Sequence, residues 1–199
     1  ANQAGVLYLQ TKKGVFQKSN STPWEIDRLS EDLGALFFDV DMDGDTDLYV
    51  ASGGSEFKSG DRLLKDRIYI NDGYGNFIKN TKALPNIFES SQAVKASDID
   101  KDGDLDAYIL NNSNIPVSSL GYAEQRDKRA QDWANVPEIF RGVGDMLLRN
   151  DNGKFVDVSE QAGIYGSLIG FGLGVMVTDM NGDLYPDIYV SNDFYERDY

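Results

Sequence analysis

Short runs of apolar and β-branched residues alternate along the chain with turns rich in glycine, asparagine and aspartate. Runs bounded in this way by turn-forming residues are typical of β-strands. The runs that predict single strands lie at residues 35–38, 48–52, 93–97, 107–111, 172–178 and 188–192. Longer segments that combine a strand, a glycine-containing turn and a phenylalanine predict β-hairpins at 6–16, 67–77 and 146–155. The pattern therefore predicts an all-β fold.

The predicted strands form a repeat. Each unit has a strand, an acidic loop, a second strand and a hairpin, so a whole unit has four strands. The chain contains half a unit, two whole units and another half, with boundaries at 1–20, 32–88, 91–163 and 168–199. Four-stranded units of about 60 residues are the size of β-propeller blades, and closed propellers have about 4–8 blades. We expect a partial β-propeller of about three blades, in contact with further blades or other chains; an open assembly is the alternative.

One segment interrupts this regularity. Asp39 and Asp98 are 59 residues apart, whereas Asp98 and Asp179 are 81 apart, and the 22 extra residues fall within 113–144. Helix-forming residues predict a helix near 122–134, inserted between the second and third strands of a blade. The insertion also carries basic and aromatic side chains, which are Tyr122, Arg126, Lys128, Arg129, Trp133, Phe140 and Arg141. We favour packing of these side chains onto the blade over contact with a partner.

The three acidic loops share one register, with an oxygen-bearing side chain at positions 1, 3, 5 and 9. These side chains are Asp39, Asp41, Asp43 and Asp47; Asp98, Asp100, Asp102 and Asp106; and Asp179, Asn181, Asp183 and Asp187. Calcium takes six to eight oxygen ligands and tolerates uneven geometry, whereas magnesium demands a stricter octahedron and is the second choice. The spacing predicts up to three calcium ions, one per loop, each also bound by a seventh-position carbonyl, from Asp45, Asp104 or Tyr185.

Details of the loops refine this prediction. Gly44 permits a sharp bend under the ion, and we expect Asp45 to turn its carboxylate outward while its carbonyl binds. The third loop is the weakest, because Leu184 replaces the glycine and Pro186 stiffens the exit.

Two other interpretations of the loops are less favoured. An EF-hand needs a glutamate at position 12 and flanking helices, but that position holds Val50, Ile109 and Val190, all within predicted strands. A solvated turn without metal would have to tolerate crowded carboxylates. Two such charges about 4 Å apart repel by roughly 4 kcal/mol at an effective dielectric constant near 20. Three loops in one register make that interpretation improbable.

Composition excludes several classes of function. The net charge is −14, and thirteen of the 33 acidic residues lie in the three loops. No basic face is evident, so nucleic acid is not an expected partner. The chain has no histidine and no cysteine, which excludes the usual zinc sites, disulfides and histidine-dependent catalysis. No apolar run approaches 18 residues, so no membrane span is predicted.

The three acidic loops resemble FG-GAP/VCBS repeats of integrin-α-like β-propellers. The resemblance includes the β-runs after each loop and Phe171-Gly172 before the third. Sequences such as N-D-G-Y-G-N-F look like bacterial secreted versions of this family. The resemblance implies a propeller of about seven blades, with calcium between the first two strands of a blade. It also implies an extracellular, secreted or cell-surface setting and binding or adhesion more often than catalysis.

The leading hypothesis is therefore a calcium-stabilised extracellular scaffold that binds a protein or glycan ligand, with calcium in a structural role. The alternative is the propeller body of a secreted polysaccharide lyase or hydrolase, because paired carboxylates can perform acid–base chemistry. The dense carboxylate groups are already explained by metal loops, so a non-enzymatic role is favoured. The other candidate catalytic residues, which lack any local signature, are Glu56, Lys65, Glu89 and Glu138.

Overall fold

The computed structural model describes residues 2–58, 60–113, 144–167, 169–193 and 196–199. Within these ranges the chain forms four antiparallel sheets, one short α-helix (α1, Ser159–Ala162) and two 3-10 helices (η1, Pro23–Asp27, and η2, Arg62–Leu64). The predicted all-β class is confirmed. The helix expected near 122–134 lies outside the described residues, as does Glu138.

The two larger sheets each contain four strands in chain order, and we call them the first and second blades. The first blade consists of β3 (Glu31–Phe38), β4 (Asp47–Gly53), β5 (Arg67–Asn71) and β6 (Phe77–Asn80). The second consists of β7 (Ser90–Ser97), β8 (Asp106–Asn112), β9 (Met146–Asn150) and β10 (Phe155–Asp157). Four-stranded antiparallel meanders are the unit of a β-propeller, so the fold is that of a partial β-propeller.

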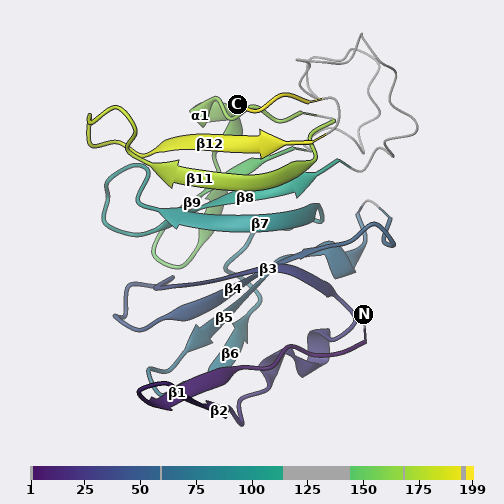
Figure 1. Ribbon diagram of the computed structural model, residues 1–199, viewed down its shortest axis with the longest axis vertical. Coiled ribbons are helices and arrows are strands. Elements are labelled where there is room, and N and C mark those ends of the chain that lie inside the picture. Colours follow the sequence, from purple (N-terminus) through teal and green to yellow (C-terminus); the bar gives the residue numbers. More distant parts are fainter. Residues whose placement is uncertain (1, 59, 114–143, 168, 194–195) are drawn as a thin grey trace.

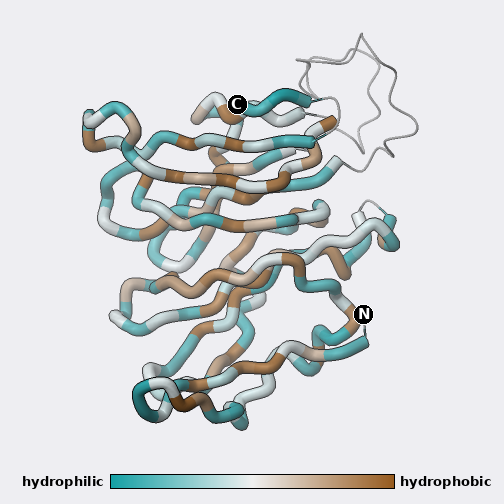
Figure 2. Tube along the Cα trace, viewed as in Figure 1, coloured by the Kyte–Doolittle hydropathy of each residue, from teal (hydrophilic) through white to brown (hydrophobic). Residues whose placement is uncertain are grey.

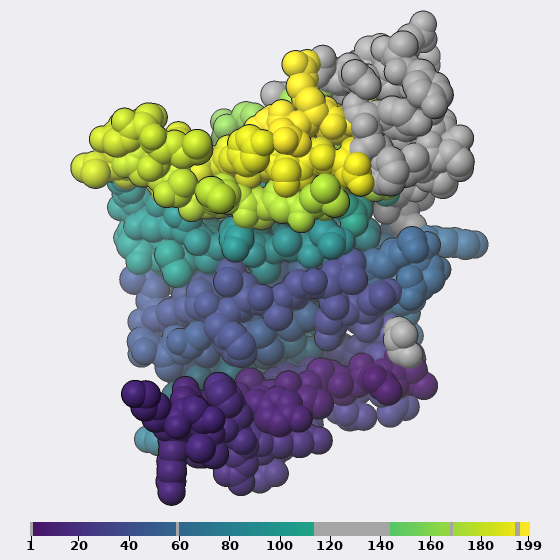
Figure 3. All heavy atoms as spheres, in the orientation of Figure 1, coloured from purple at the N-terminus to yellow at the C-terminus, as the bar shows by residue number. Residues whose placement is uncertain are grey.

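A two-stranded sheet lies at each end of the stack (Figure 1). These sheets consist of β1 (Tyr8–Lys12) and β2 (Val15–Lys18), and of β11 (Gly172–Thr178) and β12 (Asp187–Asn192). Figure 3 shows the sheets following one another along the long axis in chain order. The first strands β3, β7 and β11 pack beside one another, so the three acidic loops that follow them lie along one edge of the molecule, at the left of Figure 1.

The second strand of each blade is buried on both faces, because each blade is covered on two sides. In β5, Ile68 packs into the cluster between the two blades, whereas the next residue, Tyr69, packs with Trp24 and Phe77 on the opposite face. This is the alternation expected of a strand, and Figure 2 shows the apolar and hydrophilic stretches that result along the strands. The blades approach so closely that a Cβ on Gly53 would lie 2.7 Å from the carbonyl oxygen of Ser91.

A tyrosine–aspartate pair ties the second strand of a sheet to the segment that follows it. In the second blade, the Tyr108 hydroxyl donates to Asp145 Oδ2 at 2.9 Å, and the Asn111 N–H donates to Asp145 Oδ1 at 2.9 Å. The same pattern joins Tyr49 and the Ser52 N–H to Asp66, and Tyr189 and the Asn192 N–H to Asp198. Each of these aspartates accepts a hydrogen bond on both oxygens and so holds the segment after the second strand against that strand.

The buried carboxyl of Asp145 should make stability depend on pH. Burial raises its pKa to about 6, although the Asn111 N–H and the Tyr108 hydroxyl oppose the shift. Because the folded-state pKa is raised, its stabilising contribution is complete below the unfolded-state pKa near 4 and is lost as the pH rises through about 6. The unfolding free energy of the wild type minus that of Asp145→Asn should therefore fall by about 1–3 kcal/mol between about pH 4 and pH 7.

Chemical denaturation at a series of pH values measures this difference. Asp151→Asn is the matched control, because the Asp151 carboxylate is exposed and its hydrogen bond from Arg149 lowers its pKa. The difference for this control should stay flat over the same range. A flat difference for Asp145→Asn as well would contradict the effect of burial.

Candidate metal centres

The first acidic loop, between β3 and β4, brings carboxylates together. Carboxylate oxygens of Asp39, Asp41 and Asp43 all lie within 4.8 Å of one another. The loop is held by its own hydrogen bonds, since the Gly44 N–H donates to Asp39 Oδ2 at 3.0 Å and the Asp45 N–H donates to Asp43 Oδ1 at 3.0 Å. Gly44 has a φ of +91°, a conformation that glycine adopts without strain. The local geometry thus concentrates negative charge at one point.

Several oxygens in this loop lack partners. Asp39 Oδ1, Asp41 Oδ1 and Asp45 Oδ1 are buried and accept no hydrogen bond. Desolvation and the charges of Asp43 and Asp39 raise the pKa of Asp41. Burying a carboxylate oxygen without compensation is costly, and such oxygens are normally paired or bound to a metal. The residues of the first loop therefore fit a hard cation.

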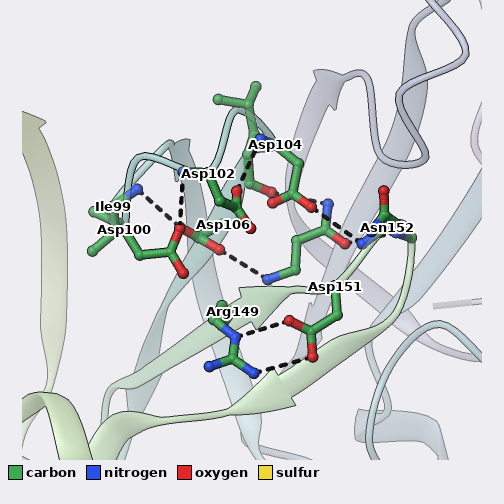
Figure 4. Close-up of polar contacts among 11 residues, drawn as sticks. Ile99, Asp100, Asp102, Asp104, Asp106, Arg149, Asp151 and Asn152 are labelled. Atoms are coloured by element: carbon green, nitrogen blue, oxygen red, sulfur yellow. Dashed lines mark hydrogen bonds and ion pairs between the residues drawn. The ribbon is translucent and has the colours of Figure 1, made fainter.

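The second acidic loop, between β7 and β8, gathers a similar cluster, in which the ninth-position Asp106 takes the place of the fifth-position aspartate. Oxygens of Asp98, Asp100 and Asp106 lie within 4.8 Å of one another, and Figure 4 shows the carboxylates of this loop facing the β9–β10 turn. Asp98 Oδ1 and Asp104 Oδ1 are buried without a partner, and the side chain of Asp104 is almost wholly enclosed. The Asp104 N–H donates to Asp102 Oδ1 at 3.1 Å. These two acidic clusters could each bind a metal ion.

The aspartate at the ninth position also has a structural role that the sequence did not reveal. Asp47 is fully buried, and its two oxygens accept from the Val40 N–H at 2.9 Å and the Asn71 N–H at 2.8 Å. Asp106 accepts in the same way from the Ile99 and Asn150 N–H groups, at 2.9 and 2.8 Å. Each carboxylate thus joins the start of its loop to the third strand of its blade.

Burial alters the protonation of these groups. Burial raises the pKa of Asp47 to about 6, against the lowering effect of its hydrogen bonds from Asn71 and Val40. Burial likewise raises the pKa of Asp106. Each oxygen of these carboxylates accepts one hydrogen bond and keeps a second lone pair, so binding of a cation is compatible with the structural role.

The carboxylates of the seventh-position aspartates, Asp45 and Asp104, point into the protein and not outward as expected for Asp45. Asp45 does not turn its carboxylate outward: Oδ1 is buried, and Oδ2 lies so close to the β5–β6 turn that a Cβ on Gly73 would be 3.3 Å from it. Asp104 Oδ2 accepts from the Asn152 N–H in the β9–β10 turn at 3.1 Å. The expectation for Asp45 was wrong because a turn later in the same blade folds over the loop.

The third acidic loop, between β11 and β12, does not gather its carboxylates as the other two do. Asp179 accepts from the Gly182 and Leu184 N–H groups at 2.7 and 2.9 Å, and Asn181 Nδ2 donates to Asp183 Oδ2 at 3.0 Å. Desolvation acts against ionisation of Asp179, but hydrogen bonds from backbone N–H groups of the loop, first those of Leu184 and Gly182, outweigh it and lower its pKa.

Asp187 repeats the structural contact of Asp47 and Asp106, and the side chain of Tyr185, whose carbonyl is the expected ligand, contacts the second loop. Asp187 accepts from the Met180 N–H at 2.8 Å, and the Tyr185 ring lies under Lys101 Nζ at 3.5 Å. Across the described part of the chain, clusters of three acids of the metal-binding kind occur in the first and second loops. The third expected calcium site thus rests on the sequence register alone.

Two asparagines that the sequence analysis overlooked support the loops. Asn71 and Asn150 each end the third strand of a blade and donate their backbone N–H to the ninth-position aspartate. Their Nδ2 groups donate to loop carbonyls, Asn71 to Thr46 at 3.1 Å and Asn150 to Val40 at 2.8 Å. The signal was present in the sequence, because both begin an Asn-Asp turn at the same place in the repeat.

Comparison with known families agrees with this architecture. Residues 39–109 match the model of an FG-GAP-like repeat. This part of the chain is similar to an FG-GAP-like repeat. The repeat runs from the first acidic loop to β8 and so contains both carboxylate clusters. The match confirms the resemblance to FG-GAP-like repeats over these residues, and the bacterial secreted type stays a prediction. A search of curated proteins gave no match, and no helix among the described residues is long and apolar enough to cross a membrane.

The two kinds of aspartate in the first loop should respond differently to substitution when a chelator removes metal. Asp47→Asn should lower the free energy of unfolding by about 1–3 kcal/mol, because an amide can accept from only one of the two buried N–H groups. Asp41→Asn should change it by less than about 0.5 kcal/mol or raise it, because a crowded charge is lost. Chemical denaturation in EDTA measures both variants. Equal losses would contradict the structural role of Asp47.

Proposed function

We propose that this protein is a calcium-stabilised extracellular β-propeller scaffold that binds a protein or glycan ligand. The observation that carries the calcium proposal is the set of buried carboxylate oxygens without partners, at Asp39, Asp41 and Asp45 in the first loop and at Asp98 and Asp104 in the second. A carboxylate oxygen enclosed in this way needs a cation or a donor. The FG-GAP-like repeat over the same residues supports this interpretation.

Calcium suits the donor set better than other common metals. The available ligands are carboxylates and carbonyls, which are hard oxygen donors, and calcium accepts six to eight of them in irregular geometry. Asp39, Asp41, Asp43 and Asp47 would hold one ion, together with the carbonyl of Asp45. A second set would hold another ion, and its members are Asp98, Asp100, Asp102 and Asp106 with the carbonyl of Asp104. A third ion in the loop 179–187 remains a prediction from the repeat.

The role of the bound metal would be to neutralise charge and order the loops. The first loop contacts the β9–β10 turn of the second blade, and the ninth-position carboxylates join both loops to the third strands of their blades. An ion there would stiffen this edge of the molecule without taking part in chemistry. A rigid edge with exposed connecting loops is a suitable platform for binding a partner, which is why we favour binding over catalysis.

The enzymatic alternative rests on one observation. Glu56 lies against Glu31, and their hydrogen bond and mutual charge raise the pKa of Glu31, while the same hydrogen bond lowers that of Glu56. Carboxyl pairs with separated pKa values serve as acid and base in glycosidases. Glu56 is exposed to solvent, which screens the pair, whereas Glu31 is half-buried with its Oε2 enclosed. Lys65, another candidate, donates to Asn86 Oδ1 at 2.8 Å. Cleavage assays on acidic and neutral polysaccharides discriminate the two functions.

Calcium should raise the thermal stability of the protein. A ligand present at a hundred times its Kd adds about 2.7 kcal/mol per site, and for a domain of this size each kcal/mol raises Tm by about 2–4 °C. Two filled sites should therefore raise Tm by roughly 10–20 °C relative to EDTA, and magnesium should raise it less. Differential scanning calorimetry measures these shifts.

Variants in each loop separate the contributions. Asp39→Asn and Asp98→Asn should each remove at least half of the calcium-dependent rise, whereas Asp151→Asn, an exposed carboxylate beside the second loop, should keep it. A Tm that is the same in calcium and in EDTA would refute the proposed metal binding.

A further inference from the structure

Asn150 connects the two candidate metal centres. Its side chain is fully buried, and its Nδ2 donates to the carbonyl of Val40 at 2.8 Å and to the carbonyl of Leu105 at 3.3 Å. Val40 lies between Asp39 and Asp41 in the first loop, and Leu105 lies between Asp104 and Asp106 in the second. One amide group thus contacts the backbone of both acidic loops, which belong to different blades.

The orientation of this amide is fixed. Asn150 Oδ1 accepts from the Gly153 N–H at 2.8 Å, so the two N–H bonds of Nδ2 must face the loop carbonyls. An amide nitrogen has two hydrogens and can serve both carbonyls at once. Because the side chain is enclosed, water does not compete for these hydrogen bonds, and a buried carbonyl that lost its donor would be costly to leave unpaired.

The rest of the β9–β10 turn also lies between the two loops. The Asn152 N–H donates to Asp104 in the second loop at 3.1 Å. Gly153 lies against the first loop, since a Cβ built on it would be 3.1 Å from the Asp41 Cβ. Gly153 also has a φ of +86°, so a side chain there would be strained as well as crowded. Because the turn contacts both loops, a displacement of one loop would shift the turn and, through it, the other loop.

The first blade offers an internal comparison. Asn71 occupies the same place in the repeat, and its Oδ1 likewise accepts from a turn N–H, that of Gly75, at 3.0 Å. Its Nδ2 donates to Thr46, in the acidic loop of its own blade. The turn beyond it packs on Leu9 of β1, at 3.1 Å from a Cβ built on Gly75. Asn71 thus supports one acidic loop, whereas Asn150 links two.

We propose that Asn150 couples the two metal centres, so that a calcium ion in one raises the affinity of the other. This inference rests on the proposed calcium binding. An ion in the first loop would draw Asp39 and Asp41 together and fix the carbonyl between them. The amide of Asn150 would then be held in place, and with it the carbonyl of Leu105 beside the ligands of the second loop. The first ion to bind would order both loops and bear the loss of conformational entropy, so the second ion would bind more tightly.

A double-mutant cycle tests the coupling. Asp179→Asn is included in every protein to silence the third loop, and calcium affinities are measured by isothermal titration calorimetry. Asp41→Asn disables the first centre and should weaken calcium binding at the second by about fivefold or more, which is the lower range of allosteric coupling. With Asn150→Ala present, Asp41→Asn should change the affinity of the second centre by less than about twofold. With Asn71→Ala as the matched control, the fivefold effect should persist.

Reciprocity provides a second test that leaves Asn150 in place, should Asn150→Ala fail to fold. Asp98→Asn, which disables the second centre, should weaken the first by the same factor, because coupling of equilibrium affinities is mutual. The side-chain amide resonances of Asn150 should also shift in NMR spectra when calcium fills either centre alone. Two centres that bind calcium independently, or an Asn150 signal that responds to one of them only, would overturn the coupling. A protein that binds no calcium at all would refute the proposed function instead.

Discussion

The buried carboxylates of Asp47 and Asp106 hold each blade together at the edge where the acidic loops lie. Each accepts main-chain hydrogen bonds from the start of its own loop and from the third strand of its blade. This places a negative charge in a poorly solvated position, and burial raises the pKa of Asp47 to about 6. These contacts hold each acidic loop next to the end of the third strand, and so next to the turn that follows that strand.

The crowded carboxylates include oxygens to which no protein group donates a hydrogen bond. Carboxylate oxygens are drawn within 4.8 Å of one another in two loops, and several are enclosed without a donor. Charges at such distances repel by several kcal/mol at the dielectric constants typical of protein surfaces. A divalent cation would reverse the sign of that interaction and supply the missing partner. Under our proposal, stability of the blade edge, metal binding and communication between blades are three consequences of one arrangement of charge.

Much of this architecture could be predicted from the sequence because it is periodic. The register of Asp39 with Asp98, together with the strand-like runs after each loop, is sufficient to indicate the four-stranded units. Contacts distant in sequence could not be predicted. Asp45 is covered by a turn at Gly73, and Asn150 reaches the carbonyl of Val40 in the preceding blade. The pairing of Tyr108 with Asp145 was overlooked for the same reason, although the residues recur in the repeat.

The third loop shows the limit of register as evidence. Asp179 keeps its place in the repeat, yet both of its oxygens accept from the loop's own N–H groups. The most direct test of the account is a crystal structure grown in calcium. It should show one ion in the first loop, about 2.3–2.6 Å from oxygens of Asp39, Asp41 and Asp43, and an equivalent ion in the second. Loops that keep their carboxylates apart and bind no ion at saturating calcium would contradict it.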